Sequence, residues 1–253
     1  ALGHNALFNN TTGEQNVAIG KDALHVNTTA SNNTAVGVEA LKANTTGASN
    51  VAVGQGALIA NTTAANNTAI GTSALAANTT GANTVAVGKS ALAANTTADG
   101  NTAIGNSSMV DCTTGSENTA LGNYAAENVT TGGNNTALGR SAGAAIQSGS
   151  NNIAVGYGAD CAHDSANSIT LGVGITGVGD YFKFGKASNV VSNQFTSDAN
   201  WARSSDERIK QDIKEDTLGL NFINDLKTIT YRWKPSNEIP EEFNDYNEEN
   251  QKD

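Results

Sequence analysis

The sequence predicts a mainly β protein: a parallel β-solenoid of about ten 17-residue coils, followed by a small α+β segment. Three observations predict it: a strict internal repeat, alternating side-chain types within each repeat, and an abrupt change of composition after the last one. Glycine recurs every 17 residues from Gly3 to Gly156, and a final step of 16 residues reaches Gly172. A fixed period held over so many units is the signature of a solenoid.

Each repeat reads approximately N-[TV]-A-[VI]-G-x-x-A-L-x-x-N-T-T-x-x-x. The first part alternates a β-branched residue, alanine and an aliphatic residue, which predicts a short strand with two different faces. Glycine then allows a turn that a Cβ atom would obstruct. The Ala-Leu pair that follows predicts a second strand, and the polar N-T-T stretch predicts a second turn. Two strands and two turns make one coil, and successive coils stack about 4.8 Å apart.

The columns of the first strand predict how the rod associates. Alanine precedes the aliphatic residue in all ten repeats up to Gly156, so we expect it to face an interior where only a methyl group fits. The aliphatic column and its β-branched neighbour then face outward along the whole rod. Three copies packed about a threefold axis would bury this apolar stripe. We therefore expect a homotrimer, with a dimer or a sandwich as the alternative, and an amide ladder along the asparagine column.

Composition excludes several classes of function. The chain has 14 Lys and Arg against 24 Asp and Glu, a formal net charge of −10, which argues against a nucleic-acid or anionic-lipid surface. No apolar run is long enough to insert in a membrane. The repeats have no aspartate column for calcium, and the three histidines occupy different places in the repeat, so neither a metal nor a cofactor is predicted. Cys112 and Cys161 lie almost three coils apart, too far for a disulfide, which fits assembly in a reducing cytoplasm.

The N-[ST]-x-A-[IV]-G unit resembles the head repeats of trimeric autotransporter adhesins. The resemblance covers Ala1 to about Gly172 and implies a left-handed parallel β-roll assembled as a trimer. Those heads usually have a shorter repeat, and a seventeen-residue form with inserted N-T-T loops is more similar to phage fibre shafts. Because the repeat is already under way at Ala1, we expect the sequence to be part of a longer chain.

The pattern breaks after the solenoid region, which we place at residues 1–172. Residues 173–204 form a predicted connector in which we expect aromatic rings to cap the trimer, as repeat arrays require. The alternative is a glycan-binding tip in which Tyr181 or Trp201 stacks on a host saccharide. The aromatic residues of this segment are Tyr181, Phe182, Phe184, Phe195 and Trp201.

Residues 205–253 form the third predicted region, and charge is much denser here. Residues 1–170 carry 4 basic and 9 acidic side chains, whereas residues 201–253 carry 8 and 13. Apolar residues at helical spacing predict a helix over 218–226, with Asp216 or Thr217 as its N-cap. Alternating side chains predict a strand over 228–233.

Two motifs in this region resemble the intramolecular chaperone auto-processing domain of phage tailspikes, tail fibres and endosialidases. They are S-D-E-R-I-K at residues 205–210 and Y-R-W-K at residues 231–234. The resemblance implies that the segment drives trimer folding and is then released by self-proteolysis through Ser205 and Lys210. A serine hydroxyl needs a base to accept its proton, and lysine can do so if burial lowers its pKa. We predict a single-turnover serine autoprotease rather than a turnover enzyme, with Ser205 as nucleophile and Lys210 as base.

The order of these regions predicts a homotrimeric phage virion fibre for reach and host attachment, assembled in the host cytoplasm. Expected partners are further copies of the chain, a host cell-surface glycan or protein receptor, and other virion proteins. The head of a bacterial trimeric autotransporter adhesin is the alternative, although a stalk and a membrane barrel would then be expected to follow. A polysaccharide depolymerase tailspike is a second alternative, but it needs paired carboxylates, and acidic residues form no column in the repeats.

Overall fold

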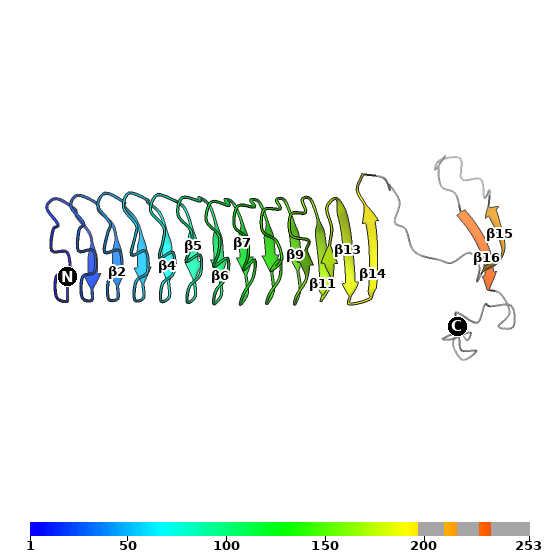
Figure 1. The fold of residues 1–253 in the computed structure, drawn as a ribbon, viewed down its shortest axis with the longest axis horizontal. Coiled ribbons are helices and arrows are strands. Elements are labelled where there is room, and N and C mark those ends of the chain that lie inside the picture. Colours follow the sequence, from blue (N-terminus) through cyan, green and yellow to red (C-terminus); the bar gives the residue numbers. More distant parts are fainter. Residues whose placement is uncertain (197–209, 217–227, 234–253) are drawn as a thin grey trace. The chain divides into compact units, whose positions relative to one another are not determined.

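The computed structural model describes residues 1–196, 210–216 and 228–233. The chain divides into two units, Ala1–Ala202 and Arg203–Asp253. The first unit is a parallel β-solenoid of about ten coils, which confirms the predicted fold class. One three-residue strand from each coil stacks on that of the next, so that the strands form a continuous sheet along the rod (Figure 1).

Neighbouring strands of the main sheet follow chain order, and register places alanine opposite alanine from coil to coil. Every pair is parallel except the last, in which β14 runs antiparallel to β13. Two short strands, β10 (Asp160–Cys161) and β12 (Thr176–Gly177), form a second parallel pair. The main sheet therefore continues beyond Gly172. Its strands are β1 (Val17–Ile19), β2 (Thr34–Val36), β3 (Val51–Val53), β4 (Thr68–Ile70), β5 (Val85–Val87), β6 (Thr102–Ile104), β7 (Thr119–Leu121), β8 (Thr136–Leu138), β9 (Ile153–Val155), β11 (Ile169–Val173), β13 (Tyr181–Lys186) and β14 (Asn189–Gln194).

The central alanine of each of the strands β1 to β9 is buried in the narrow interior, as the sequence predicts. The glycine after each strand has a φ that L side chains rarely adopt, for example +136° at Gly71. A Cβ atom on Gly71 would lie 2.4 Å from the carbonyl oxygen of Gly88 in the next coil. Glycine is needed at this column because the backbones of successive coils approach too closely for any side chain.

The prediction of a second strand in each coil is wrong. The Ala-Leu pair lies in a turn, where leucines such as Leu24 and Leu41 adopt a φ of 50°. The backbone N–H of Leu24 still donates to the carbonyl oxygen of Ala40 in the next coil, at 3.0 Å. The left-handed conformation costs about 1–2 kcal/mol per residue. Full burial of a leucine side chain contributes about 1.5–3 kcal/mol and offsets that cost.

Two asparagine columns connect the coils. In the column that opens each strand, the amide oxygen accepts from a backbone N–H, as from Asn50 to Asn33 Oδ1 at 2.9 Å. The predicted ladder is therefore present here as side-chain to backbone bonds. The asparagines of the N-T-T stretch form a direct side-chain ladder, in which Asn61 Nδ2 donates to Asn44 Oδ1 at 2.8 Å and to the carbonyl oxygen of Ala64 at 3.0 Å. Both columns are buried, and their bonds leave few orphaned amide groups.

The side-chain ladder ends at Asn95, because its next position along the column is Cys112. Asn95 Oδ1 is buried without a hydrogen-bond partner among the described residues. The Cys112 thiol donates instead to the carbonyl oxygen of Gly115, at 3.2 Å. Cys112 and Cys161 are both free and buried. Burial raises the pKa of the Cys112 thiol to about 11.

The described part of the second unit is an antiparallel pair, β15 (Lys210–Asp216) and β16 (Thr228–Trp233). The strand predicted over 228–233 is confirmed. Asp216 ends β15, and the helix predicted over 218–226 lies outside the described residues, as does Thr217.

Candidate functional site

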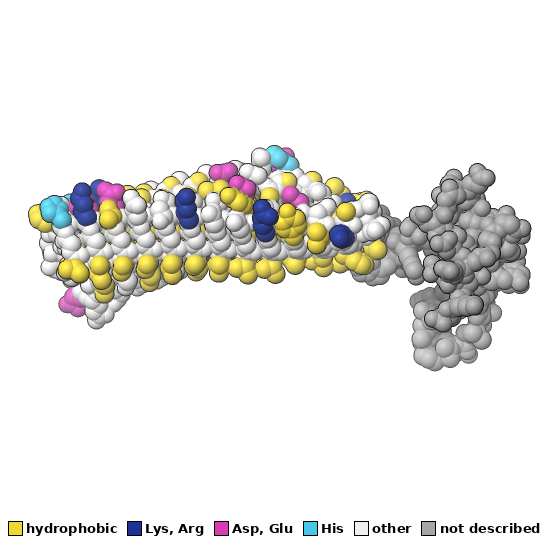
Figure 2. Space-filling model, turned by 90° about the horizontal axis from the view of Figure 1, so that it is seen from below, with side chains coloured by type: hydrophobic (Ala, Val, Ile, Leu, Met, Phe, Trp, Pro, Cys, Tyr) yellow, Lys and Arg dark blue, Asp and Glu magenta, His cyan; other side chains and the backbone are white. Residues whose placement is uncertain are grey.

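The outer face of the solenoid sheet carries an apolar stripe, which we define as the first and third residues of strands β1 to β9. Alternation along each strand turns these side chains away from the interior alanine. Ile19 in β1 and Leu138 in β8 are 41% and 43% exposed. Several first positions are threonine, and these interrupt the stripe without ending it. Figure 2 shows hydrophobic side chains in a row along one edge of the solenoid. A row of this length is typical of a surface that associates with another apolar surface.

The last coil carries the aromatic side chains of β13. The phenol hydroxyl of Tyr181 donates to Gln194 Oε1 on β14 at 3.0 Å, and the Lys183 ammonium lies 5.7 Å from the centroid of the Tyr181 ring. The rings of Phe182 and Phe184 are 5.6 Å apart. The hydrogen bond from Tyr181 to Gln194 ties β13 to β14 where the parallel sheet ends. Trp201, the other residue predicted to contact a saccharide, lies outside the described residues.

The structure describes only one residue of the predicted Ser–Lys pair. Lys210 is the first residue of β15 and lies opposite Trp233 of β16. Ser205 lies outside the described residues. The pairing of β15 and β16 brings Lys210, the last residue of the S-D-E-R-I-K motif, beside the strand that carries the first three residues of the Y-R-W-K motif.

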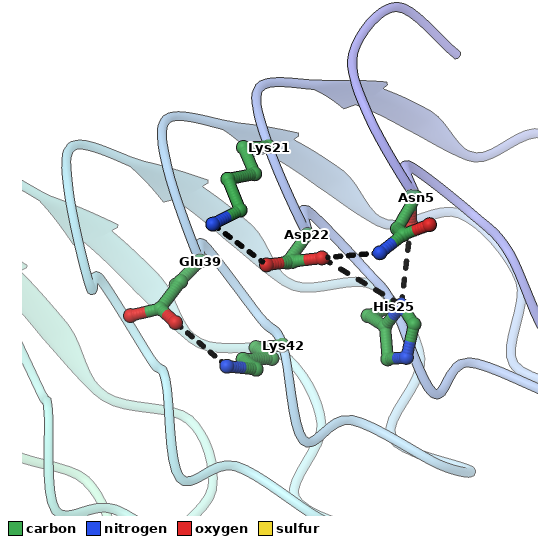
Figure 3. A network of polar contacts seen from close by, with 6 residues as sticks. All are labelled: Asn5, Lys21, Asp22, His25, Glu39 and Lys42. Carbon is green, nitrogen blue, oxygen red and sulfur yellow. Dashed lines mark hydrogen bonds and ion pairs between the residues drawn. The ribbon is translucent and has the colours of Figure 1, made fainter.

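A polar network on the first coils was not identified from the sequence (Figure 3). The Asn5 amide donates to Asp22 Oδ1 at 3.0 Å and lowers the pKa of that carboxyl from its usual value. The hydrogen bond from Lys42 to Glu39, at 2.6 Å, raises the pKa of the lysine. Asn5 and Asp22 are one repeat apart, and polar residues spaced by 17 are the signal that would have revealed the contact. The residues drawn are Asn5, Lys21, Asp22, His25, Glu39 and Lys42.

The network is a set of surface contacts between coils rather than a metal site. Within the described ranges, no three His, Cys, Asp or Glu residues are grouped to hold a metal ion. The same residues contain no helix of the length and apolarity that a bilayer crossing requires.

Comparison with known proteins identifies the second unit. Residues 205–251 match the family model "Chaperone of endosialidase". The chain carries an endosialidase-type chaperone domain after its β-solenoid. No curated protein and no solved structure matched the chain.

The endosialidase-type chaperone domain indicates the class of function. Such a domain implies a capacity for autoproteolysis and chaperoning, and domains of this family act in trimeric proteins. A β-solenoid followed by this domain is typical of phage fibres and tailspikes. The family match begins at Ser205, the first residue of the predicted reactive motif.

Proposed function

We propose that the chain is part of a homotrimeric phage fibre whose solenoid supplies reach and host attachment, and whose chaperone domain directs assembly and is then cut away. The observation that carries the proposal is the order of the two units: a rod with an outward apolar stripe stands directly before an endosialidase-type chaperone domain. A chaperone that assembles trimers is needed where the subunits have a long surface that must be matched in register.

The apolar stripe supports trimerisation through the solenoid. Its side chains recur once per coil, so each coil would meet the same coil of the other subunits around a threefold axis. Burial of apolar area stabilises such an association by about 25 cal/mol per Å². Each coil would bury its two stripe residues, so the stabilisation of the trimer would increase with the number of coils.

Sedimentation velocity tests this assembly. The full chain should sediment as a trimer. Ile70→Lys, which places three ammonium groups around the axis, should dissociate or weaken it. Thr72→Lys is the matched control, because Thr72 is exposed in the turn of the same coil and outside the stripe. A folded monomer of the unsubstituted chain at micromolar concentration would contradict the proposal, and circular dichroism separates dissociation from unfolding.

The proposed cleavage uses Ser205 and Lys210. The Ser205 hydroxyl attacks the carbonyl carbon of an adjoining peptide bond while its proton passes to the neutral Lys210 amine. The ammonium then protonates the leaving nitrogen as the C–N bond breaks, and water hydrolyses the resulting ester. A neutral lysine requires a lowered pKa, which a buried and assembled trimer would supply.

Intact-mass spectrometry tests the cleavage. The full chain should lose a fragment that begins beside residue 205, whereas Ser205→Ala and Lys210→Met should remain intact. Ser204→Ala is a matched control, because it removes the neighbouring hydroxyl and should leave cleavage unchanged. Equal cleavage in Ser205→Ala would overturn the assignment of the nucleophile.

Tyr181 is better suited to capping than to saccharide contact. Its hydroxyl is committed to a hydrogen bond with Gln194 of β14 at the end of the sheet. A saccharide role therefore falls to Trp201 within this segment. Trp201→Ala should reduce attachment of the trimer to host cells if the tip binds a receptor, and Tyr181→Phe should have little effect.

A further inference from the structure

Three uncommon side chains of the solenoid lie close together in the sequence. Tyr124 and Tyr157 are the only Phe, Tyr or Trp residues between Phe8 and Tyr181, and Arg140 is the only arginine in the first 202 residues. Three such residues within 34 positions point to a local requirement that the repeat alone does not impose.

The fold brings these three side chains onto successive coils. Tyr124 follows β7, Arg140 follows β8 and Tyr157 follows β9, each two or three residues past the strand end. Strands β7, β8 and β9 pair in register. The backbone between them is also tied, since the N–H of Gly158 donates to the carbonyl oxygen of Arg140 at 3.0 Å. Two coil steps of about 4.8 Å place the tyrosines about 10 Å apart along the axis, with the arginine between them.

The patch formed by Tyr124, Arg140 and Tyr157 is open to solvent. Tyr124 is 37% exposed and Tyr157 is 56% exposed. The Arg140 guanidinium lies 5.6 Å from the centroid of the Tyr157 ring. Among the described residues it has no carboxylate partner, whereas Lys21 and Lys42 are each paired with an acid. On the face drawn in Figure 2, basic side chains are few and separate.

Tyr124 also breaks a local rule of the repeat. Its φ is +57°, a left-handed conformation that is strained for a bulky residue. The same position in other coils is mostly occupied by residues that tolerate this conformation, such as Asp22, Ser73 and Ser90. The fold does not require a tyrosine here, since serine, aspartate and glycine occupy the same position in other coils. A strained outlier of this kind is a candidate functional position.

We propose that this patch binds an acidic saccharide, and the proposal rests on the attachment function above. The two phenol rings, spaced about two sugar units apart, would stack on the apolar faces of two pyranose rings that are separated by one further sugar unit. The Arg140 guanidinium would form a charge-assisted pair with a carboxylate on the sugar. Its cation–π contact with Tyr157 holds the guanidinium beside the stacking surface.

Binding is measured by isothermal titration of the full chain with a uronic-acid oligosaccharide and its carboxyl-reduced counterpart. The chain should prefer the acidic sugar. Tyr157→Ala and Arg140→Gln should each weaken binding about tenfold, and Arg140→Gln should also abolish the preference for the acidic form. Tyr157→Phe keeps the ring and should bind as the unsubstituted chain does. Lys89→Gln is the matched control, because Lys89 occupies the same column three coils earlier.

Tyr124→Ser provides an independent readout. It should weaken saccharide binding and at the same time raise the unfolding temperature, because serine relieves the left-handed strain. A variant that loses binding by misfolding would show the opposite thermal shift. If Tyr124→Ser lowers the unfolding temperature and leaves binding unchanged, the tyrosine is structural and the site is overturned.

Attachment of the labelled chain to a panel of bacterial strains separates this site from the proposed function. If the chain attaches and Arg140→Gln and Tyr157→Ala attach equally well, the patch is not the saccharide site and the attachment function stands. If the unsubstituted chain attaches to no strain, the attachment function itself fails. If the substitutions change the oligomeric state, the patch is a subunit contact and the saccharide proposal is overturned.

Discussion

The first and last parts of the solenoid share one backbone but fill the same buried position in two ways. From Asn10 to Asn95 the position three residues after the inner leucine is asparagine, and the amides bond to one another from coil to coil. From Cys112 onward the position is apolar, with Val129 and Ile146 in the next two coils, and both are buried. The comparison shows that this column must be occupied by a buried side chain whose polar groups, if it has any, are hydrogen-bonded. The side chain itself need not be polar.

In the apolar part, the sizes of two interior residues of each coil change together. As the column residue grows, the inner residue three positions earlier shrinks. The successive pairs are Leu92 with Asn95, Met109 with Cys112, Ala126 with Val129, and Gly143 with Ile146. The last two pairs each hold four side-chain carbon atoms, and a close-packed interior tolerates an exchange that keeps the total volume.

In the polar part, the hydrogen bonding of each amide depends on an unbroken row of asparagines from coil to coil. Each amide satisfies its neighbour, so a single apolar residue leaves a donor on one side and an acceptor on the other. The acceptor is already orphaned at Asn95 Oδ1, where the two parts meet. If the ladder ended one coil earlier or later, the unpaired amide oxygen would lie on another asparagine but would still be present.

The largest effect is expected from placing the valine of the apolar part into the polar ladder. Asn61→Val leaves Asn44 Oδ1 without its donor and removes the acceptor of one Asn78 N–H. Each buried group left unpaired costs roughly 1–3 kcal/mol, so the free energy of unfolding should fall by about 2–5 kcal/mol. Urea unfolding followed by circular dichroism measures the loss.

The reciprocal substitution sharpens the same comparison. Val129→Asn places a lone amide in the apolar column, where only its N–H groups find a carbonyl, and should cost about 1–3 kcal/mol. A loss of stability in Asn61→Val no larger than that of Asn61→Gln, which keeps both amide groups, would show that the ladder contributes shape rather than hydrogen bonds.

Cys112 gives a pH-dependent measure of the apolar part. Its pKa rises from 9.0 to about 11 on folding because burial disfavours the thiolate. Below pH 9 the thiol is protonated in both states and its contribution to stability is fully present. Between pH 9 and pH 11 the unfolded chain loses its proton first, so stability should fall by about 2–3 kcal/mol. Unfolding curves of the unsubstituted chain and of Cys112→Val should diverge over this window, and parallel curves would contradict the assigned burial effect.

Side-chain alternation and the 17-residue period were sufficient to predict the strands, the interior alanines and the exposed stripe. They failed at the Ala-Leu pair, because two adjacent apolar residues resemble a strand and nothing in the letters indicates a left-handed leucine. Composition also showed that Tyr124, Arg140 and Tyr157 are rare. Their proximity became evident only from the register of the coils. Ser205 and Lys210 stay a prediction from a motif, since no repeat or alternation marks them.

The smallest effect tests the paired volumes directly. A Cβ atom on Gly143 would lie 3.2 Å from Ile146 Cδ1 and from Ala137 Cβ, so Gly143→Ala should destabilise the protein by about 1–2 kcal/mol. Ile146→Val removes the Cδ1 methyl, and the double variant recreates the Ala126 and Val129 pair of the preceding coil. The double variant should therefore be more stable than the sum of its parts predicts, by about 1 kcal/mol. Strict additivity would show that the left-handed backbone at residue 143, and not the volume of residue 146, sets the requirement for glycine.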